Sequence, residues 1–153
     1  MNHKPRILFF STGNAARSRM AAGFLCTSIN EQAIGATSTA VKATDVSSLT
    51  VEVMQEVGID ITKQQAKSVE QSLKEHFACV VTLSDDSKER SPVWPFTKNL
   101  VHWNVVDPAS TPGTMEQRRN AFRAVRDELQ QLVGEFVRSV IPDLSAHGLV
   151  KLG

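Results

Sequence analysis

The segment FFSTGNAARSRMA, residues 9–21, decides how this chain of 153 residues folds. Its first residues complete an apolar run, residues 7–10, of the kind found in strands buried on both faces of a parallel sheet. The turn Ser-Thr-Gly-Asn follows, and apolar residues then recur at helical spacing between Met20 and Leu25. The segment therefore predicts a strand that enters a helix through a short loop.

That loop has features of an anion-binding loop. Backbone N–H groups at the positive end of a helix dipole can surround a tetrahedral oxyanion, and Arg17 can donate two parallel hydrogen bonds to it. Gly13 and Asn14 tolerate the positive φ angles that such a loop needs. Neither a Walker A motif nor G-x-G-x-x-G is present. A plain connection stays open as the alternative, with Arg17 on the helix surface and Ser11 and Ser18 as cap hydroxyls.

Strand and helix patterns alternate along the rest of the chain. Further strands are expected at residues 33–38, 77–83 and 100–105. Helices are expected from an N-cap at Ser48 to a stop at Gly58, over residues 69–76, and from a capping box of Thr114 and Gln117 to Pro142. This order predicts an α/β fold, a three-layer sandwich with a four-stranded parallel sheet. Ligands in such folds bind beyond the carboxyl ends of the strands, so the loop at 11–18, the loop after Leu83 and Asp107 should converge.

Composition and charge indicate which partners, which location and how many domains to expect. The net charge is +1, with basic and acidic residues in balance, which favours neither nucleic acid nor a membrane as a partner. The chain has no apolar run of 18 residues and no signal-peptide pattern near its start. We therefore expect a cytoplasmic protein with a single domain over residues 1–153, of which 142–153 form a C-terminal tail.

Cysteine and histidine give no sign of a metal site. Cys26 and Cys79 fit no zinc or disulfide spacing, and both are expected to be small buried apolar residues. The histidines also lack ligand spacing and are expected at the surface or half-buried; they are His3, His76, His102 and His147. We expect neither a metal nor a cofactor.

Several segments carry a family resemblance. STGNAARSRMA, residues 11–21, resembles the C-x5-R-S phosphate loop of low-molecular-weight protein tyrosine phosphatases, with Ser11 at the position of the nucleophilic cysteine. Residues 5–141 resemble the thioredoxin-coupled arsenate reductases of that family. The matching segments are VGIDITKQQAKSV (57–69), VVTLSDDSKERSPVWP (80–95), VHWNVVDPAS (101–110) and FRAVRDELQQLV (122–133).

The resemblance implies a role for each of these positions. In the family, a cysteine thiolate attacks phosphorus or arsenic, the loop and its arginine hold the oxyanion, and an Asp-Pro aspartate protonates the leaving group. The corresponding candidate catalytic residues are Ser11, Arg17 and Asp107, although Asp107 can also be read as a helix or turn cap. The oxyanion-binding positions are Ser11, Thr12, Gly13, Asn14, Ala15, Ala16, Arg17 and Ser18. The two further cysteines of the family's redox relay correspond to Ser84 and Ser91.

Serine at these three positions changes the chemistry. A thiol of pKa about 8.5 becomes a thiolate at a helix N-terminus, whereas a hydroxyl there stays protonated and needs an adjacent base. Arsenate reduction also needs thiols to oxidise. We therefore expect a pseudoenzyme that binds phosphate, arsenate or sulfate without hydrolase or oxidoreductase turnover. The alternatives are an adaptor that recognises a phosphorylated protein and, less favoured, a flavodoxin-like module for a phosphorylated cofactor.

The serines have two possible origins. Engineering to trap an oxyanion or block disulfides would change these three positions and spare Cys26 and Cys79. Natural divergence leaves other departures, and Ala22 stands where some family members have a cation-binding glutamate. Because engineering has no reason to change that position, we favour a naturally degenerate member of the family.

Overall fold

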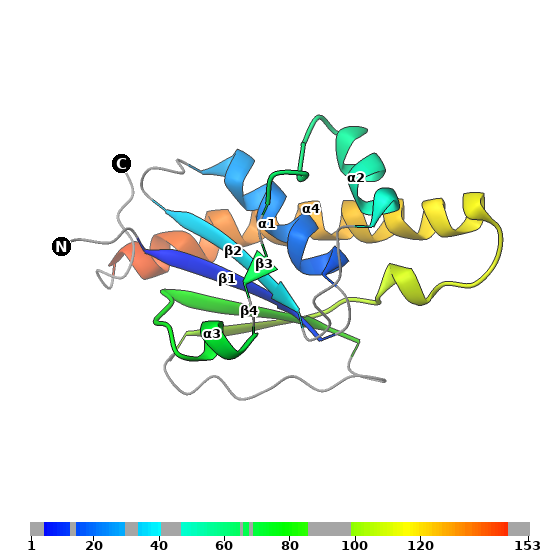
Figure 1. The fold of residues 1–153 in the computed structure, drawn as a ribbon. Coiled ribbons are helices and arrows are strands. Elements are labelled where there is room, and N and C mark those ends of the chain that lie inside the picture. Colours follow the sequence, from blue (N-terminus) through cyan, green and yellow to red (C-terminus); the bar gives the residue numbers. More distant parts are fainter. Residues whose placement is uncertain are drawn as a thin grey trace.

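The fold is a parallel sheet between helices, seen in the computed structural model (Figure 1). The structure describes residues 5–12, 15–29, 34–40, 47–64, 66–67, 69–85 and 99–146. Its strands are β1 (Arg6–Ser11), β2 (Gly35–Ala40), β3 (Ala66–Lys67), β4 (Cys79–Ser84) and β5 (Leu100–Asn104). All paired strands are parallel, and the order β3-β2-β1-β4-β5 places β1 at the centre.

The predicted fold class is confirmed. The four expected strands form the body of the sheet, and each lies within two residues of its predicted start. The two-residue strand β3 was not predicted; it extends the edge by pairing with Ser38 and Thr39 of β2. So short a strand has no alternating pattern of its own, because its place depends on the neighbouring strand.

Helices cover both faces of this sheet. The larger core lies against α1 (Ala16–Ser28), α2 (Ser48–Gln55) and α4 (Met115–Ala146), and includes Phe9, Met20 and Phe136. On the other face, α3 (Val69–Leu73) packs over a smaller cluster around Leu8 and Phe10. The short helix η1 (Pro108–Ser110) joins β5 to α4. Figure 1 shows α1, α2 and α4 together on one side and α3 on the opposite side.

The start of α2 differs by one residue from the prediction. Ser47 is its N-cap, with an extended backbone and a side chain that accepts a hydrogen bond from Thr50 N–H at 3.4 Å. Ser48 is the first helical residue instead. The other end agrees with the prediction, because Gly58 has φ of 79° and its N–H bonds to the Gln55 carbonyl.

The helix α4 begins as predicted and ends later. Thr114 and Gln117 form the expected capping box, with N···O distances of 2.8 and 3.1 Å between each backbone N–H and the other side chain. The expected stop at Pro142 is wrong, because the helix continues to Ala146. Pro142 lies within the last five residues of α4, so the backbone hydrogen bond that it removes and the crowding of the preceding turn by its ring are confined to the end of the helix.

The two cysteines differ in burial. Cys79 is fully buried, as expected, and burial raises the pKa of its thiol to about 12. Cys26, near the end of α1, is only half-buried, so the expectation of a buried residue is not met there. Across the described part of the chain, no helix has the length and hydropathy of a membrane span.

Candidate functional site

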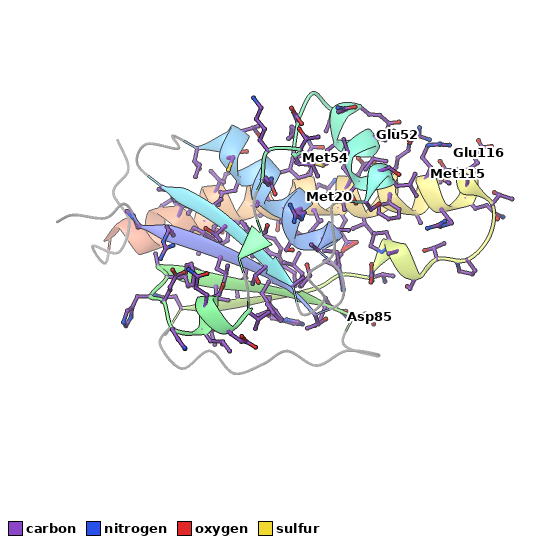
Figure 2. All side chains as sticks on the ribbon, in the orientation of Figure 1. Met20, Glu52, Met54, Asp85, Met115 and Glu116 are labelled. Atoms are coloured by element: carbon purple, nitrogen blue, oxygen red, sulfur yellow. The ribbon has the colours of Figure 1, made fainter. Side chains whose placement is uncertain are left out.

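The site lies where the central strand β1 ends and α1 begins. Ser11 is the last residue of β1 and pairs in register with Leu83 of β4. The next residue, Thr12, donates its N–H to the Leu83 carbonyl at 3.3 Å. Ala15 and Ala16 then start α1, so the helix N-terminus opens onto the carboxyl edge of the sheet. Asp85, which follows β4, lies at this same edge in Figure 2.

Ser11 supplies the helix with a hydrogen-bond acceptor. The N-cap residue of α1, Ala15, has no side-chain acceptor. The Ser11 hydroxyl fills that role, because its Oγ accepts the Ser18 N–H at 2.7 Å. Ser18 in turn donates its own hydroxyl to the Ala15 carbonyl at 3.2 Å. Both serines therefore close the first turn of α1. Their hydroxyls act as caps, as the alternative interpretation expected, and they also lie at the candidate site.

Arg17 is buried and points into the molecule rather than onto the helix surface. Its side chain is 0% exposed. One guanidinium nitrogen, Nη1, donates to the Val105 carbonyl at 2.8 Å, and Nη2 lies 3.9 Å from Oδ2 of Asp107. A buried charge is stable only with such partners. Arg17 thus joins the start of α1 to the segment that follows β5.

Asp107 lies beside this arginine. Its Oδ1 accepts the Ala109 N–H at 3.0 Å, which makes Asp107 the N-cap of η1. Pro108 occupies the first position of that helix, where its missing N–H has no cost. The side chain of Asp107 is 18% exposed. One carboxylate oxygen therefore holds the local turn, while the other faces the buried guanidinium.

Of the two serines that the resemblance places at the relay positions, the structure describes only Ser84. Ser84 ends β4 and is 1% exposed, and its carbonyl accepts the Val105 N–H at 3.0 Å. Its Oγ lies 3.5 Å from Nε2 of His102. Ser91 is outside the described residues, as are Gly13 and Asn14.

The structure brings four of the predicted site residues into one region. Ser11, Arg17, Ser18 and Asp107 come together at the carboxyl edge, joined by the contacts above. The sequence prediction missed the Val105 carbonyl, because a backbone group leaves no trace in the sequence. It also missed His102, whose Nδ1 lies 2.7 Å from Thr82 Oγ1. Thr82 and His102 are directly opposite in neighbouring strands, but the sequence does not give the register of those two strands.

A second buried arginine supports the other side of this helix turn. Arg19 is 5% exposed, and its Nη1 donates to the Gln64 carbonyl at 3.2 Å. The Gln64 side-chain amide donates back to the Arg19 carbonyl, also at 3.2 Å. This reciprocal pair fixes the first turn of α1 against residues 59–64. The positive end of the helix and the guanidinium of Arg17 favour a negative charge near the carboxyl edge.

The surroundings of the Ser11 hydroxyl bear on whether it could act as a nucleophile. Among the described residues, Ser11 Oγ has one hydrogen-bond partner, the Ser18 N–H, and no imidazole or carboxylate accepts its proton. A serine without an adjacent base is a poor nucleophile. No group of three or more His, Cys, Asp or Glu side chains that could hold a metal occurs within the described ranges.

Comparison with known proteins assigns the chain to a family. Residues 6–146 match the family described as low molecular weight phosphotyrosine protein phosphatase. The arsenate reductase of Halalkalibacterium halodurans is 34% identical over 137 residues, which are 90% of this chain and 98% of the relative. The Bacillus subtilis arsenate reductase is 32% identical over 133 residues, 87% and 95% of the two chains.

Solved structures agree with these matches. An arsenate reductase in the oxidised state superposes with a TM-score of 0.73 at 26% identity, covering 88% of this chain and 98% of that one. An arsenate reductase in the phosphate-binding state superposes with a TM-score of 0.70 at 26% sequence identity, covering 88% of this chain and 97% of that one. The low molecular weight protein tyrosine phosphatase of T. tengcongensis superposes with a TM-score of 0.63 at 26% sequence identity, covering 88% of this chain and 99% of that one. This chain belongs to the low molecular weight phosphotyrosine protein phosphatase family.

Proposed function

We propose that this protein binds a phosphate-like oxyanion in the loop at residues 11–18 and does not turn it over. The observation that carries the proposal is the buried Arg17 at the start of α1, which lies beside Asp107 and next in sequence to Ser18, the partner of the Ser11 hydroxyl. A solved relative in a phosphate-binding state supports the same ligand class. Phosphate and arsenate are the ligands that the family relationship favours, with sulfate as a further tetrahedral anion.

The absence of turnover rests on Ser11. We propose that it occupies the position of the nucleophilic cysteine, and that Ser84 and Ser91 occupy the relay positions. The hydroxyl of Ser11 accepts a helix N–H instead of facing a general base. Without thiols at these positions the protein has no electrons to give to arsenate.

The experiment measures binding and activity in the same samples. Isothermal titration calorimetry with phosphate and arsenate is expected to show one site, while p-nitrophenyl phosphate hydrolysis stays at background. Ser11→Cys is expected to bring phosphatase activity, and adding Ser84→Cys and Ser91→Cys to bring thioredoxin-coupled arsenate reduction. A Ser11→Ala variant is the matched control, since it changes the same position without adding a thiol. Phosphatase turnover by the unaltered protein would contradict the proposal.

The alternative is a regulatory adaptor that recognises a phosphorylated partner through the same loop. Titration with a phosphotyrosine peptide separates the two. An affinity for the peptide far above that for free phosphate would favour the adaptor, whereas equal or weaker peptide binding favours the free anion as ligand.

A further inference from the structure

We infer that the site selects oxyanions that carry a hydrogen, such as hydrogenphosphate and hydrogenarsenate, over sulfate. This inference rests on the proposed function and names the ligand class of the same site. It follows from which groups at the site can donate a hydrogen bond and which can only accept one.

The loop side of the site offers donors. Arg17 has a guanidinium, which has five N–H groups and no acceptor. At Ser11, the acceptor side of the hydroxyl is occupied by the Ser18 N–H at 2.7 Å, so its hydrogen is directed elsewhere. Among the described residues no acceptor for that hydrogen is present. Any tetrahedral anion can use such donors, because all of them have oxygen lone pairs, so Arg17 and Ser11 alone do not distinguish phosphate from sulfate.

Asp107 adds an acceptor next to these donors. Its Oδ1 is fixed by the Ala109 N–H, and Oδ2 lies 3.9 Å from Arg17 Nη2. An anion that binds this guanidinium next to Asp107 therefore meets a carboxylate. The carboxylate is held there by the cap of η1 and by Pro108, rather than by the ligand. It can only accept hydrogen bonds when ionised.

A fixed carboxylate affects the two kinds of anion differently. Hydrogenphosphate and hydrogenarsenate carry an O–H that can donate to it in a short, charge-assisted hydrogen bond. Sulfate has no hydrogen at neutral pH, so it meets Asp107 only as a like charge in a partly buried site. The difference is expected to be about tenfold or more in dissociation constant, the usual size of a hydrogen bond to a charged group.

The test compares three anions at neutral pH on the unaltered protein. Calorimetric titrations with phosphate, arsenate and sulfate are expected to give similar affinities for the first two and binding about tenfold weaker or more for sulfate. Methyl phosphate, whose dianion above neutral pH has no hydrogen, is expected to bind like sulfate. Sulfate binding as tight as phosphate would overturn the inference and leave the proposed function intact. Failure of every anion to bind would overturn the proposed function itself.

The variant Asp107→Asn tests whether Asp107 is responsible for the preference for phosphate over sulfate. The amide oxygen can still accept the Ala109 N–H, so the cap of η1 is kept, while the charge is lost. We expect sulfate affinity to rise and phosphate affinity to fall, bringing the two within about twofold. Glu128→Gln is the matched control, because it removes one negative charge from an exposed position on α4. An unchanged phosphate-to-sulfate ratio in a folded Asp107→Asn protein would assign the selectivity elsewhere; if that variant does not fold, methyl phosphate decides.

Discussion

The side chain of Arg17 is completely buried, and its planar guanidinium has a partner on each of two sides. Its Nη1 bond to the Val105 carbonyl and its approach to Asp107 require the fork of a guanidinium. A lysine ammonium is a point charge that cannot reach both partners and an anion together. Arg17 is therefore the residue on which the proposed binding depends most.

We expect Arg17→Lys to weaken phosphate binding by at least about tenfold, since it removes a bidentate, charge-assisted contact. Calorimetric titration measures the change. Arg138→Lys is the matched control, because Arg138 is exposed on α4. Equal phosphate affinities in the two variants would show that the guanidinium of Arg17 does not touch the anion.

The cysteines allow a separate prediction at the level of single residues. Burial raises the pKa of the Cys79 thiol to about 12, so almost none of it is thiolate at pH 8, and the side chain is fully buried. Cys26 is half-buried. Ellman's reagent is expected to label one thiol in the native protein and both in denaturant. A Cys26→Ser protein is expected to show no native labelling, and rapid labelling of that variant would contradict the burial of Cys79.

Among the elements, α2 is attached to α4 by a line of ion pairs. Arg119 contacts Glu52, and Arg123 and Arg126 both contact Glu56. Arg126 also donates to the Val53 carbonyl at 2.9 Å, near the end of α2. Figure 2 shows Glu52 on the part of α2 nearest the start of α4. Three arginines on one helix face thus meet two glutamates on the other.

This arrangement predicts an acid-sensitive contribution to stability. The hydrogen bonds from Arg123, and then from Arg126, lower the pKa of Glu56 from 4.5 to about 2. A lowered folded-state pKa stabilises the fold above the unfolded value and is lost as pH falls, here between about 4.5 and 2. Glu56→Gln is expected to lower Tm at pH 7 and to differ less from the parent near pH 2.5. A constant Tm difference across this range would show that the pairs do not contribute; Glu128→Gln is the control.

The start of α2 gives a prediction with two adjacent serines. Ser47 is the N-cap, whereas Ser48 is already helical. Ser47→Ala is expected to cost about 1 kcal/mol of unfolding free energy, the usual loss for a cap. Ser48→Ala is expected to cost nothing, because alanine is the better helix former. Urea denaturation of both variants measures the difference, and the reverse order would place the cap at Ser48.

The elements also show where prediction from sequence succeeds. The apolar run at 7–10 and the capping box at Thr114 were strong local signals, and both elements formed there. The two serines at the start of α2 could not be told apart, because either can cap a helix. Pro142 predicts a stop, but α4 continues for four residues beyond it, since the cost of a proline can be borne close to a helix end. Local patterns thus located the elements, while their exact ends depended on backbone geometry.

At the scale of the whole molecule, anion binding should be visible as stability. A ligand that binds only the folded state at 100 times its dissociation constant adds about 2.7 kcal/mol. For a domain of this size the expected rise in Tm is roughly 5–10 °C. Differential scanning fluorimetry with phosphate measures it, with chloride at matched ionic strength as the control. An unchanged Tm at saturating phosphate would contradict binding at the start of α1.

The assembled site could be predicted only in part. The loop at 11–18 and Asp107 could be predicted to lie at one edge, because each follows a strand and the carboxyl ends of parallel strands meet at the same edge of the sheet. The Arg17 contact with Val105 could not be foreseen, since it joins a side chain to a backbone group 88 residues away. Pairing over such a distance depends on the packing of the whole sheet.

That long separation has a consequence for the order of assembly. The loop at 11–18 leaves the ribosome early, but the carbonyl that holds its arginine is made almost ninety residues later. The central strand β1 likewise cannot pair with β4 until Cys79, the first paired residue of β4, has been made. Contacts between distant parts of a chain form slowly. A nascent chain that stops before Val105 therefore has the loop at 11–18 without the carbonyl that orients Arg17, and the proposed capacity to hold phosphate arises only after that residue has been made.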